Sequence, residues 1–223
     1  MKILNLFAGI GGNRTLWGTQ HQITAIENNE KIAEIYNKRF PTDEVIVDDA
    51  YEYFINNYEN YDILWASPPC ISHSRNNYGL NGYVYKNKRR KIQLPDLRLY
   101  SLILFCKHMF KGKYLIENVI PYYEPLIKPD FIRGRHMYWT NVDIIFKQRT
   151  KEYIGSFGTY EKKEIIEEYA AKRKISLSIF DGFNLGKYKQ NQIIRDMILP
   201  EEGKYLLDCL IYNTQQKLEA WLK

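Results

Sequence analysis

The chain has 223 residues, of which 45% are hydrophobic, and this composition is sufficient for one substantial core. Its formal net charge is +6, and its three cysteines, Cys70, Cys106 and Cys209, include no Cys-x-x-Cys pair. This argues against both a disulfide framework and a zinc site, so we expect no metal. The apolar run within residues 1–9 is too short for a signal peptide, and no later run reaches membrane-spanning length, so we expect a cytoplasmic protein.

Apolar runs alternate with helical periodicities along the first half of the chain. This pattern predicts strands at residues 3–7, 23–27, 45–47, 63–66 and 114–117, and helices at 31–40 and 97–110. A further strand is predicted at 136–146. We therefore predict a single-domain α/β protein whose central sheet is mainly parallel and carries helices on both faces.

A glycine-rich loop, Phe7 to Gly12, directly follows the first predicted strand. Its glycines permit positive φ and a close approach of a ligand, but it lacks the Walker lysine and departs from the GxGxxG pattern. Glu27 ends the second strand and suits a pair of ribose hydroxyls, although its spacing suits a helix cap equally well. Asp48 and Asp49 follow the third strand and can accept from an adenine amino group. These residues predict an adenosine-containing ligand of unspecified type.

The stretch Ser67-Pro68-Pro69-Cys70 follows the fourth strand. Two prolines fix two φ angles and remove two donors, so the cysteine is presented on a stiff loop. Ligands of open α/β sheets lie beyond the carboxyl ends of the strands, so we expect the glycine loop, Cys70 and Glu117 around one crevice. A lone cysteine is more often a small buried hydrophobe, and we expect this of Cys106 and Cys209.

Residues 71–95 contain six cations and no acidic residue. Such a run can be no more than a solvated basic loop. It directly follows the stiff cysteine loop, however, and it mixes three tyrosines and two glycines with its charges. We therefore predict that it clamps a polyanion.

Five short motifs resemble, in order, those of the cytosine-5 DNA methyltransferases. They fall within residues 4–135 and read Leu6 to Gly12, Pro68-Pro69-Cys70, Asp96 to Leu102, Glu117-Asn118-Val119 and Arg133-Gly134-Arg135. The resemblance implies a Rossmann-like methyltransferase fold, S-adenosylmethionine as cofactor and DNA cytosine-5 methylation as the activity. The chain departs from the family pattern at Ile71, Phe131 and Asp196, where glutamine, glutamine and asparagine are usual.

The resemblance also implies the roles of individual residues. Cys70 would be the nucleophile that adds to carbon 6 of cytosine, and Glu117 the acid at ring nitrogen 3. Arg135, with Arg133 beside it on the same face of one strand, would hold the carbonyl oxygen of the base. From the residues alone, Glu117 could instead cap a helix beginning near Pro121, and the two arginines could face solvent.

Two larger sets of residues follow from the glycine loop, the basic run and the resemblance. The expected cofactor-binding residues are Phe7, Ala8, Gly9, Gly11, Gly12, Glu27, Asn28, Asp48, Asp49, Pro68 and Leu102. The expected nucleic-acid-binding residues are Ser72, Ser74, Arg75, Lys86, Lys88, Arg89, Arg90 and Lys91.

The resemblance divides the chain into three regions. Residues 1–149 would be the catalytic and cofactor-binding core, 150–190 a short target-recognition excursion containing an acidic helix near 161–168, and 191–223 a segment that returns to the core. In that last segment a helix at 200–222 would turn Leu206, Leu207 and Leu210 inward.

The implied partner is duplex DNA with its target cytosine flipped out, bound by a monomer. A cognate restriction endonuclease is a candidate further partner. Two alternatives stay open, a tRNA cytosine-5 methyltransferase and a catalytically silent regulator that binds DNA or cofactor. A methylase of free nucleotides is disfavoured, because the cationic loop would have no use on a small substrate.

Overall fold

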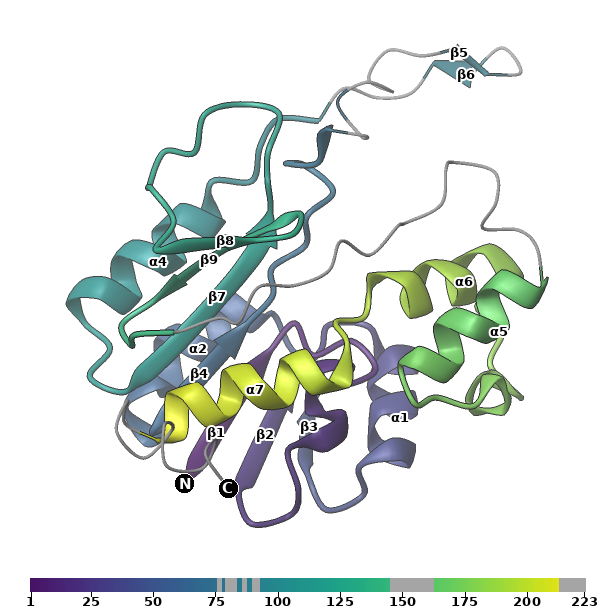
Figure 1. Cartoon of the computed structure of the whole chain (residues 1–223), viewed down its shortest axis with the longest axis horizontal. Coiled ribbons are helices and arrows are strands. Elements are labelled where there is room, and N and C mark those ends of the chain that lie inside the picture. The colour runs from purple at the N-terminus through teal and green to yellow at the C-terminus, as the bar shows by residue number, and fades with distance from the viewer. Residues whose placement is uncertain (76–77, 79–83, 86–87, 90–92, 145–162, 213–223) are drawn as a thin grey trace.

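The computed structural model describes residues 1–75, 78, 84–85, 88–89, 93–144 and 163–212. A seven-stranded sheet has the order β3-β2-β1-β4-β7-β9-β8 (Figure 1). Its strands are β1 (Lys2–Leu6), β2 (Gln22–Ile26), β3 (Glu44–Ile46), β4 (Ile63–Ala66), β7 (Lys113–Val119), β8 (Phe131–Arg133) and β9 (His136–Thr140). The first five strands in that order are parallel, whereas β9 and β8 are antiparallel additions at one edge. A separate two-stranded ribbon pairs β5 (Val84–Tyr85) with β6 (Lys88–Arg89).

Helices lie on both faces of the sheet (Figure 1). The α-helices are α1 (Glu30–Arg39), α2 (Ala50–Asn57), α4 (Arg98–His108), α5 (Lys163–Lys172), α6 (Lys187–Asp196) and α7 (Pro200–Ile211). Three short 3-10 turns are η1 (Asn13–Leu16), η2 (Tyr58–Asn60) and η4 (Leu177–Phe180). This architecture confirms the predicted α/β class with a mainly parallel sheet.

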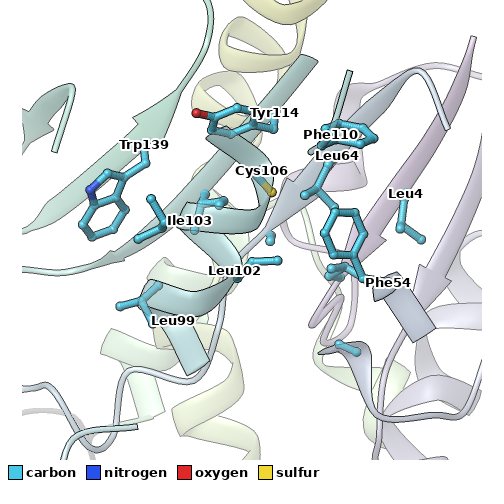
Figure 2. Packing of buried hydrophobic residues seen from close by; sticks show 14 of the residues in the cluster. Leu4, Phe54, Leu64, Leu99, Leu102, Ile103, Cys106, Phe110, Tyr114 and Trp139 are labelled. Atoms are coloured by element: carbon cyan, nitrogen blue, oxygen red, sulfur yellow. The ribbon is translucent and has the colours of Figure 1, made fainter. Parts of the chain in front are cut away.

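The two faces of the sheet carry separate cores because successive side chains of a strand point to opposite sides. Leu4 and Leu64 pack against α2 and α4 on one face. Ile103 of α4 and Trp139 of β9 belong to the same cluster (Figure 2). A second set on the opposite face contains Ile3, Trp65 and Leu115 together with Leu206, Leu207 and Leu210 of α7. The predicted inward leucines are therefore confirmed, and Cys106 and Cys209 are each buried with 1% of their surface exposed, as expected.

The predicted strand at 136–146 is too long, because β9 ends at Thr140. At this point β9 has reached the beginning of its partner β7, where Thr140 pairs with Leu115. The Thr140 hydroxyl donates to the oxygen of Tyr114, and the Asn141 side chain accepts from the nitrogen of Tyr114 at 3.0 Å. These two side-chain hydrogen bonds take the place of the next backbone hydrogen bonds between β9 and β7. Of the predicted helix at 200–222, residues 213–222 lie outside the described part.

The structure removes the alternative in which Glu117 caps a helix, and it shows that the expected placement of Arg133 and Arg135 along one strand is wrong. Residues 120–130 form turns and bends without a helix, so Glu117 does not cap a helix near Pro121. Arg133 ends β8, Gly134 adopts a φ of +61°, and Arg135 completes a tight turn into β9. The two arginines therefore do not alternate along one strand, because a glycine in the left-handed region reverses the chain between them.

The described residues of the 150–190 segment pack on the core. Residues of α5, η4 and α6 form one cluster with Ile10 of the glycine loop and with α1, whose inner face supplies Ile32 and Ile35. Among the described residues no helix has the length and apolar character needed to span a bilayer.

Candidate active site

The glycine loop lies where the strand order reverses between β1 and β4, and two of its conformations are unusual. Phe7 has a φ of +56° and Gly9 a φ of +55°, both in the left-handed region. A Cβ on Gly9 would meet nothing within 4 Å, so the loop leaves space there, whereas a Cβ on Gly11 would come within 2.4 Å of the Phe40 ring. Glycine at 11 thus allows the loop to pack on α1, while the space at Gly9 suits a ligand.

Glu27 binds this loop directly. Its Oε2 accepts from the Gly9 nitrogen at 3.0 Å, and its Oε1 accepts from the Asn29 nitrogen at 3.0 Å. Burial raises the pKa of Glu27 above its usual range, and the hydrogen bonds from Asn29 and Gly9 oppose that rise. The cap of α1 is Asn29, whose side chain accepts from Ile32, so Glu27 is not the cap. Its carboxylate is placed beside the loop, next to Asn28.

The acidic pair after β3 has local structural roles as well. The Asp49 side chain caps α2 by accepting from the Tyr51 and Glu52 nitrogens at 2.9 and 3.2 Å. Asp48 accepts from the Asp49 nitrogen at 2.7 Å. The Tyr51 ring meets the Phe7 ring edge to face at 5.0 Å, which adds an aromatic wall close to the glycine loop.

Leu102 is not brought to this crevice. It is 3% exposed in the core under α4, with Leu99 and Ile103 as neighbours in the same cluster. Its position on the inner face of α4 explains this, because that face covers the sheet.

The cysteine loop after β4 is joined to the end of β7. The Asn118 side chain, 1% exposed, donates to the oxygen of Pro68 at 2.9 Å. The oxygen of Cys70 accepts from the nitrogens of His73 and Ser74 at 3.0 and 2.9 Å. The loop is therefore held on both sides of Cys70, and one of its supports is the residue after Glu117.

The thiol of Cys70 is strongly affected by its surroundings. Burial, followed by the carboxylates of Asp196 and Glu117, raises the pKa of Cys70 to about 11, and Arg195 acts weakly in the opposite direction. Cys70 is therefore a neutral thiol near pH 7. The effects of Asp196 and Glu117 also mean that both carboxylates lie within electrostatic range of the sulfur.

Asp196 reaches this region because residues 195–197 dock on the glycine loop. A Cβ on Gly12 would come within 2.9 Å of the Cβ of Met197, so only glycine permits this contact. Arg173, which is 8% exposed, donates to the oxygen of Met197 at 2.9 Å and to the oxygen of Arg195 at 3.3 Å. The sequence shows Asp196 as a departure from the family pattern, but nothing in it indicates that this side chain lies near Cys70.

Three of the predicted nucleic-acid-binding residues anchor the beginning of the basic segment. Ser72 accepts from the Asp96 nitrogen at 3.1 Å, Ser74 forms a backbone bridge to Pro121, and Arg75 donates to the oxygen of Pro121 at 3.0 Å. Of the remaining predicted cations, Lys88 and Arg89 form β6, whereas Lys86, Arg90 and Lys91 lie outside the described residues.

His73 is a buried residue that the sequence reasoning missed. It is 1% exposed and contacts the Tyr123 hydroxyl through Nδ1, and Tyr123 also accepts from the hydroxyl of Tyr100 at 3.3 Å. Burial lowers the pKa of His73, with Asp96 acting in the opposite direction. The position of His73, three residues after a candidate nucleophile, was the only signal for it.

The two arginines are placed differently from each other. Arg133 donates from Nε to Glu202 of α7 at 2.8 Å, so it ties β8 to that helix. Arg135 lies in the turn, and its oxygen accepts from Ile120 at 2.9 Å, close to the carboxyl end of β7. His136, which follows it, places Nε2 at 3.6 Å from Oε1 of Glu117.

A separate hollow of about 570 Å³ lies away from these groups, at the amino ends of the strands, and is lined among others by Lys2, His21 and Asp62. It has none of the candidate residues. The carboxyl ends of β1, β2, β4 and β7 therefore carry most of the candidate residues.

Comparisons with known proteins bear on the family resemblance and on the fold. Residues 1–87 match the family model described as C-5 cytosine-specific DNA methylase. No curated protein matches the chain. The chain is similar to the solved structure of the Entamoeba histolytica methyltransferase EhMeth, with 13% identity over 95% of this chain and 98% of that one, and a TM-score of 0.58.

A second similar structure is a mutant of DNMT2 from Spodoptera frugiperda, with 26% identity over 53% of this chain and a TM-score of 0.36. The chain spans 35% of the length of that protein. The resemblance predicted from the motifs is thus confirmed over residues 1–87, and the predicted fold is confirmed over nearly the whole chain. The family match implies S-adenosylmethionine as the methyl donor, and the space at Gly9 beside the half-buried carboxylate of Glu27 is compatible with its adenosine portion.

Proposed function

Taking as premise that residues 1–87 carry the C-5 cytosine-specific DNA methylase match, we propose that this protein methylates carbon 5 of cytosine in duplex DNA. One observation supports this above the others. The bond between Asn118 and Pro68 fixes the cysteine loop after β4 against the end of β7 that carries Glu117, which supports a candidate nucleophile and a candidate acid acting on one base.

The cofactor would be held by the glycine loop, with its ribose at Glu27, and would supply the methyl group. Phe7 and Tyr51 would give the adenosine an apolar wall. Asp49 would accept from the adenine amino group through its remaining lone pairs, because its Oδ1 already caps α2.

The protein's own residues would make the cytosine reactive. The thiol of Cys70 first gives its proton to water; the resulting thiolate adds to carbon 6, and the electron pair of the ring double bond moves towards carbon 5. Glu117 gives its proton to ring nitrogen 3 in the same step, which prevents negative charge from accumulating on the base. Arg135, at the turn beside Ile120, is the candidate for holding the carbonyl oxygen. After methylation a base takes the proton of carbon 5 and the Cys70 sulfur leaves.

The raised pKa of Cys70 has a function in this scheme. A neutral thiol is a weak nucleophile, so the free protein keeps Cys70 unreactive. Protonation of Glu117 removes one of the two negative charges that raise this pKa. Ionisation of Cys70 is thereby coupled to the arrival of a base that needs the Glu117 proton.

Carbon 6 is hidden in a duplex, so the target base must leave the stack. Residues 71–95, anchored at Ser72, Ser74 and Arg75, would pack behind it and neutralise phosphates. We expect affinity for DNA to fall steeply with salt, because each phosphate contact releases counterions.

Transfer of tritium from labelled S-adenosylmethionine tests the substrate. Duplex DNA and tRNA are supplied in parallel, to wild type and to Cys70→Ser. Label in DNA that is lost in Cys70→Ser supports the proposal. Label in tRNA alone would favour the tRNA alternative, with which the short region at 150–190 is compatible, and no label on either would favour a silent regulator.

A further inference from the structure

His136 is close to the candidate acid and is more exposed to solvent than that acid. Its Nε2 is 3.6 Å from Oε1 of Glu117, and the His136 side chain is 37% exposed whereas that of Glu117 is 17% exposed. The proposed reaction requires Glu117 to carry a proton when a base is bound, although the base itself covers the crevice. His136 offers this carboxyl a second path to water.

The register of the sheet fixes this pair. Glu117 of β7 is opposite Tyr138 of β9, and Val119 is opposite His136. His136 and Glu117 are thus diagonal neighbours on the same face of an antiparallel pair, within reach of long side chains. The contact is built from two strands rather than from a loop.

The charged groups around His136 come from β7, β8, α7 and the turn before β9. Glu117 faces it from β7, Arg133 is its direct partner in β8, and Arg135 precedes it in the turn. Glu202 of α7 binds Arg133 at 2.8 Å, with both side chains largely buried at 9% and 19% exposure. Charged and ionisable groups therefore alternate in the order Glu202, Arg133, His136 and Glu117, and the cation of Arg133 is matched by Glu202.

We propose that His136 is the residue through which Glu117 exchanges its proton with solvent, an inference that rests on the proposed cytosine methylation. Imidazolium at His136 gives its proton to the Glu117 carboxylate, leaving neutral imidazole and a neutral carboxylic acid. The acid gives this proton to ring nitrogen 3 as the Cys70 thiolate adds to carbon 6. When the sulfur leaves, nitrogen 3 returns the proton to Glu117, and His136 takes it up again.

The distance of 3.6 Å is too long for a direct hydrogen bond, but it is suited to exchange. A small rotation of either side chain, or one bridging water, closes it, and acid–base contacts often tighten only when substrate binds. Histidine is also the side chain that gains and loses protons near neutral pH. His136 acts through Glu117, so it is a positioning and proton-exchange residue rather than one that contacts the base.

The first test is the pH dependence of single-turnover methyl transfer to duplex DNA. His136→Gln keeps a polar side chain of similar length but carries no exchangeable charge, and His108→Gln on the exposed part of α4 is the matched control. We expect His136→Gln to be slower by about a hundredfold, the lower end of the range for a lost acid–base group, with a flattened pH profile. Added imidazole should rescue His136→Ala but not Glu117→Gln. A His136→Gln profile that superimposes on wild type would overturn the inference.

The second test needs no activity. Thermal unfolding of wild type, His136→Gln, Glu117→Gln and the double variant gives a double-mutant cycle at pH 5.5 and at pH 8. The pair predicts a coupling energy that is larger at pH 5.5 than at pH 8, because an imidazolium attracts a carboxylate more strongly than a neutral imidazole does. Absence of coupling at both values would overturn the inference, even if the protein is an active methyltransferase. A wild-type protein that labels no cytosine would instead show that the proposed function itself is wrong, and the inference would fall with it.

Discussion

The side-chain amide of Asn118 donates to the backbone oxygen of Pro68 at 2.9 Å, and both groups are buried. This bond joins the segment before Cys70 to the residue after Glu117. It therefore ties together the segments that carry the candidate nucleophile and the candidate acid, which follow from the neighbouring strands β4 and β7.

Asn118→Asp tests this bond, because a carboxylate of the same shape cannot donate to the oxygen of Pro68. We expect a loss of about 1–3 kcal/mol in the free energy of unfolding, the cost of an unsatisfied buried acceptor. We also expect methyl transfer to slow by about a hundredfold, as is usual for a misplacement of about 1 Å. Asn56→Asp, on the exposed face of α2, is the control and should change neither. Chemical denaturation and single-turnover rates measure the two effects, and an unchanged rate would separate Asn118 from catalysis.

Glu27→Gln tests the cofactor side of the crevice. The amide has one acceptor oxygen where the carboxylate has two, so the bonds from Gly9 and Asn29 cannot both be kept. We expect the affinity for S-adenosylmethionine to fall about tenfold, equivalent to 1.4 kcal/mol. Isothermal calorimetry measures this, with Glu34→Gln on the exposed face of α1 as control. Equal affinities in the two variants would remove Glu27 from the binding site.

Asp196→Asn should make Cys70 more reactive. The negative charge of Asp196 helps to raise the pKa of Cys70 to about 11, so its removal lowers this pKa and increases the thiolate fraction. Alkylation of Cys70 by iodoacetamide at pH 8.5, followed by peptide mass spectrometry, should therefore become several-fold faster. Asp181→Asn, an exposed substitution outside the site, should leave the rate unchanged. A rate that stays the same or falls in Asp196→Asn would contradict the placement of this carboxylate.

The raised pKa of Cys70 also predicts how the stability of the protein changes at alkaline pH. Because the pKa is raised in the folded state, the contribution of Cys70 to stability is fully present below pH 9 and is lost as pH rises towards 11. Cys70→Ala should therefore flatten the decline in unfolding free energy between these pH values. Urea titrations of both proteins at pH 8.5 and 10.5 measure it, and parallel declines would be inconsistent with a shifted thiol.

Gly203→Ala tests how α7 supports the glycine loop. A Cβ at this position would come within 2.6 Å of the oxygen of Asn13, in the turn that follows the loop. We expect a loss of about 1–3 kcal/mol in stability from this overpacking. Lys204→Ala, the next and exposed position, should cost about 0.5 kcal/mol or less, since it removes only a surface ion pair. Equal losses in the two variants would contradict close packing at Gly203.

Much of the fold could be predicted because buried parallel strands are visible as apolar runs. The predicted strand at 63–66 coincides with β4, and those at 3–7 and 23–27 differ from β1 and β2 by one residue at each end. The gathering of the candidate residues at one edge of the sheet could be predicted for a related reason. The glycine loop and Glu117 each mark the end of such a run, and the carboxyl ends of parallel strands meet at one edge.

The rest depends on contacts that no local pattern encodes. Arg133 to His136 read as continuous strand, but Gly134 in the left-handed region makes a hairpin and places His136 beside Glu117. Asp196 comes within electrostatic range of Cys70 because Arg173 and Met197 dock a distant helix end on the glycine loop. Contacts between segments far apart in the chain depend on tertiary packing. The positions of His136 and Asp196 beside the candidate residues therefore could not be predicted from sequence spacing.

The most direct measurement is covalent trapping. Wild type and Cys70→Ser are incubated with S-adenosylmethionine and duplex DNA that contains 5-fluorocytosine, and the products are separated under denaturing conditions. Fluorine cannot leave carbon 5 as a proton does, so the enzyme stalls with its sulfur on carbon 6. We predict a denaturation-resistant protein–DNA adduct with wild type and none with Cys70→Ser. An adduct that persists in Cys70→Ser, or its absence from wild type that binds both cofactor and DNA, would contradict Cys70 as the nucleophile of a DNA cytosine-5 methyltransferase.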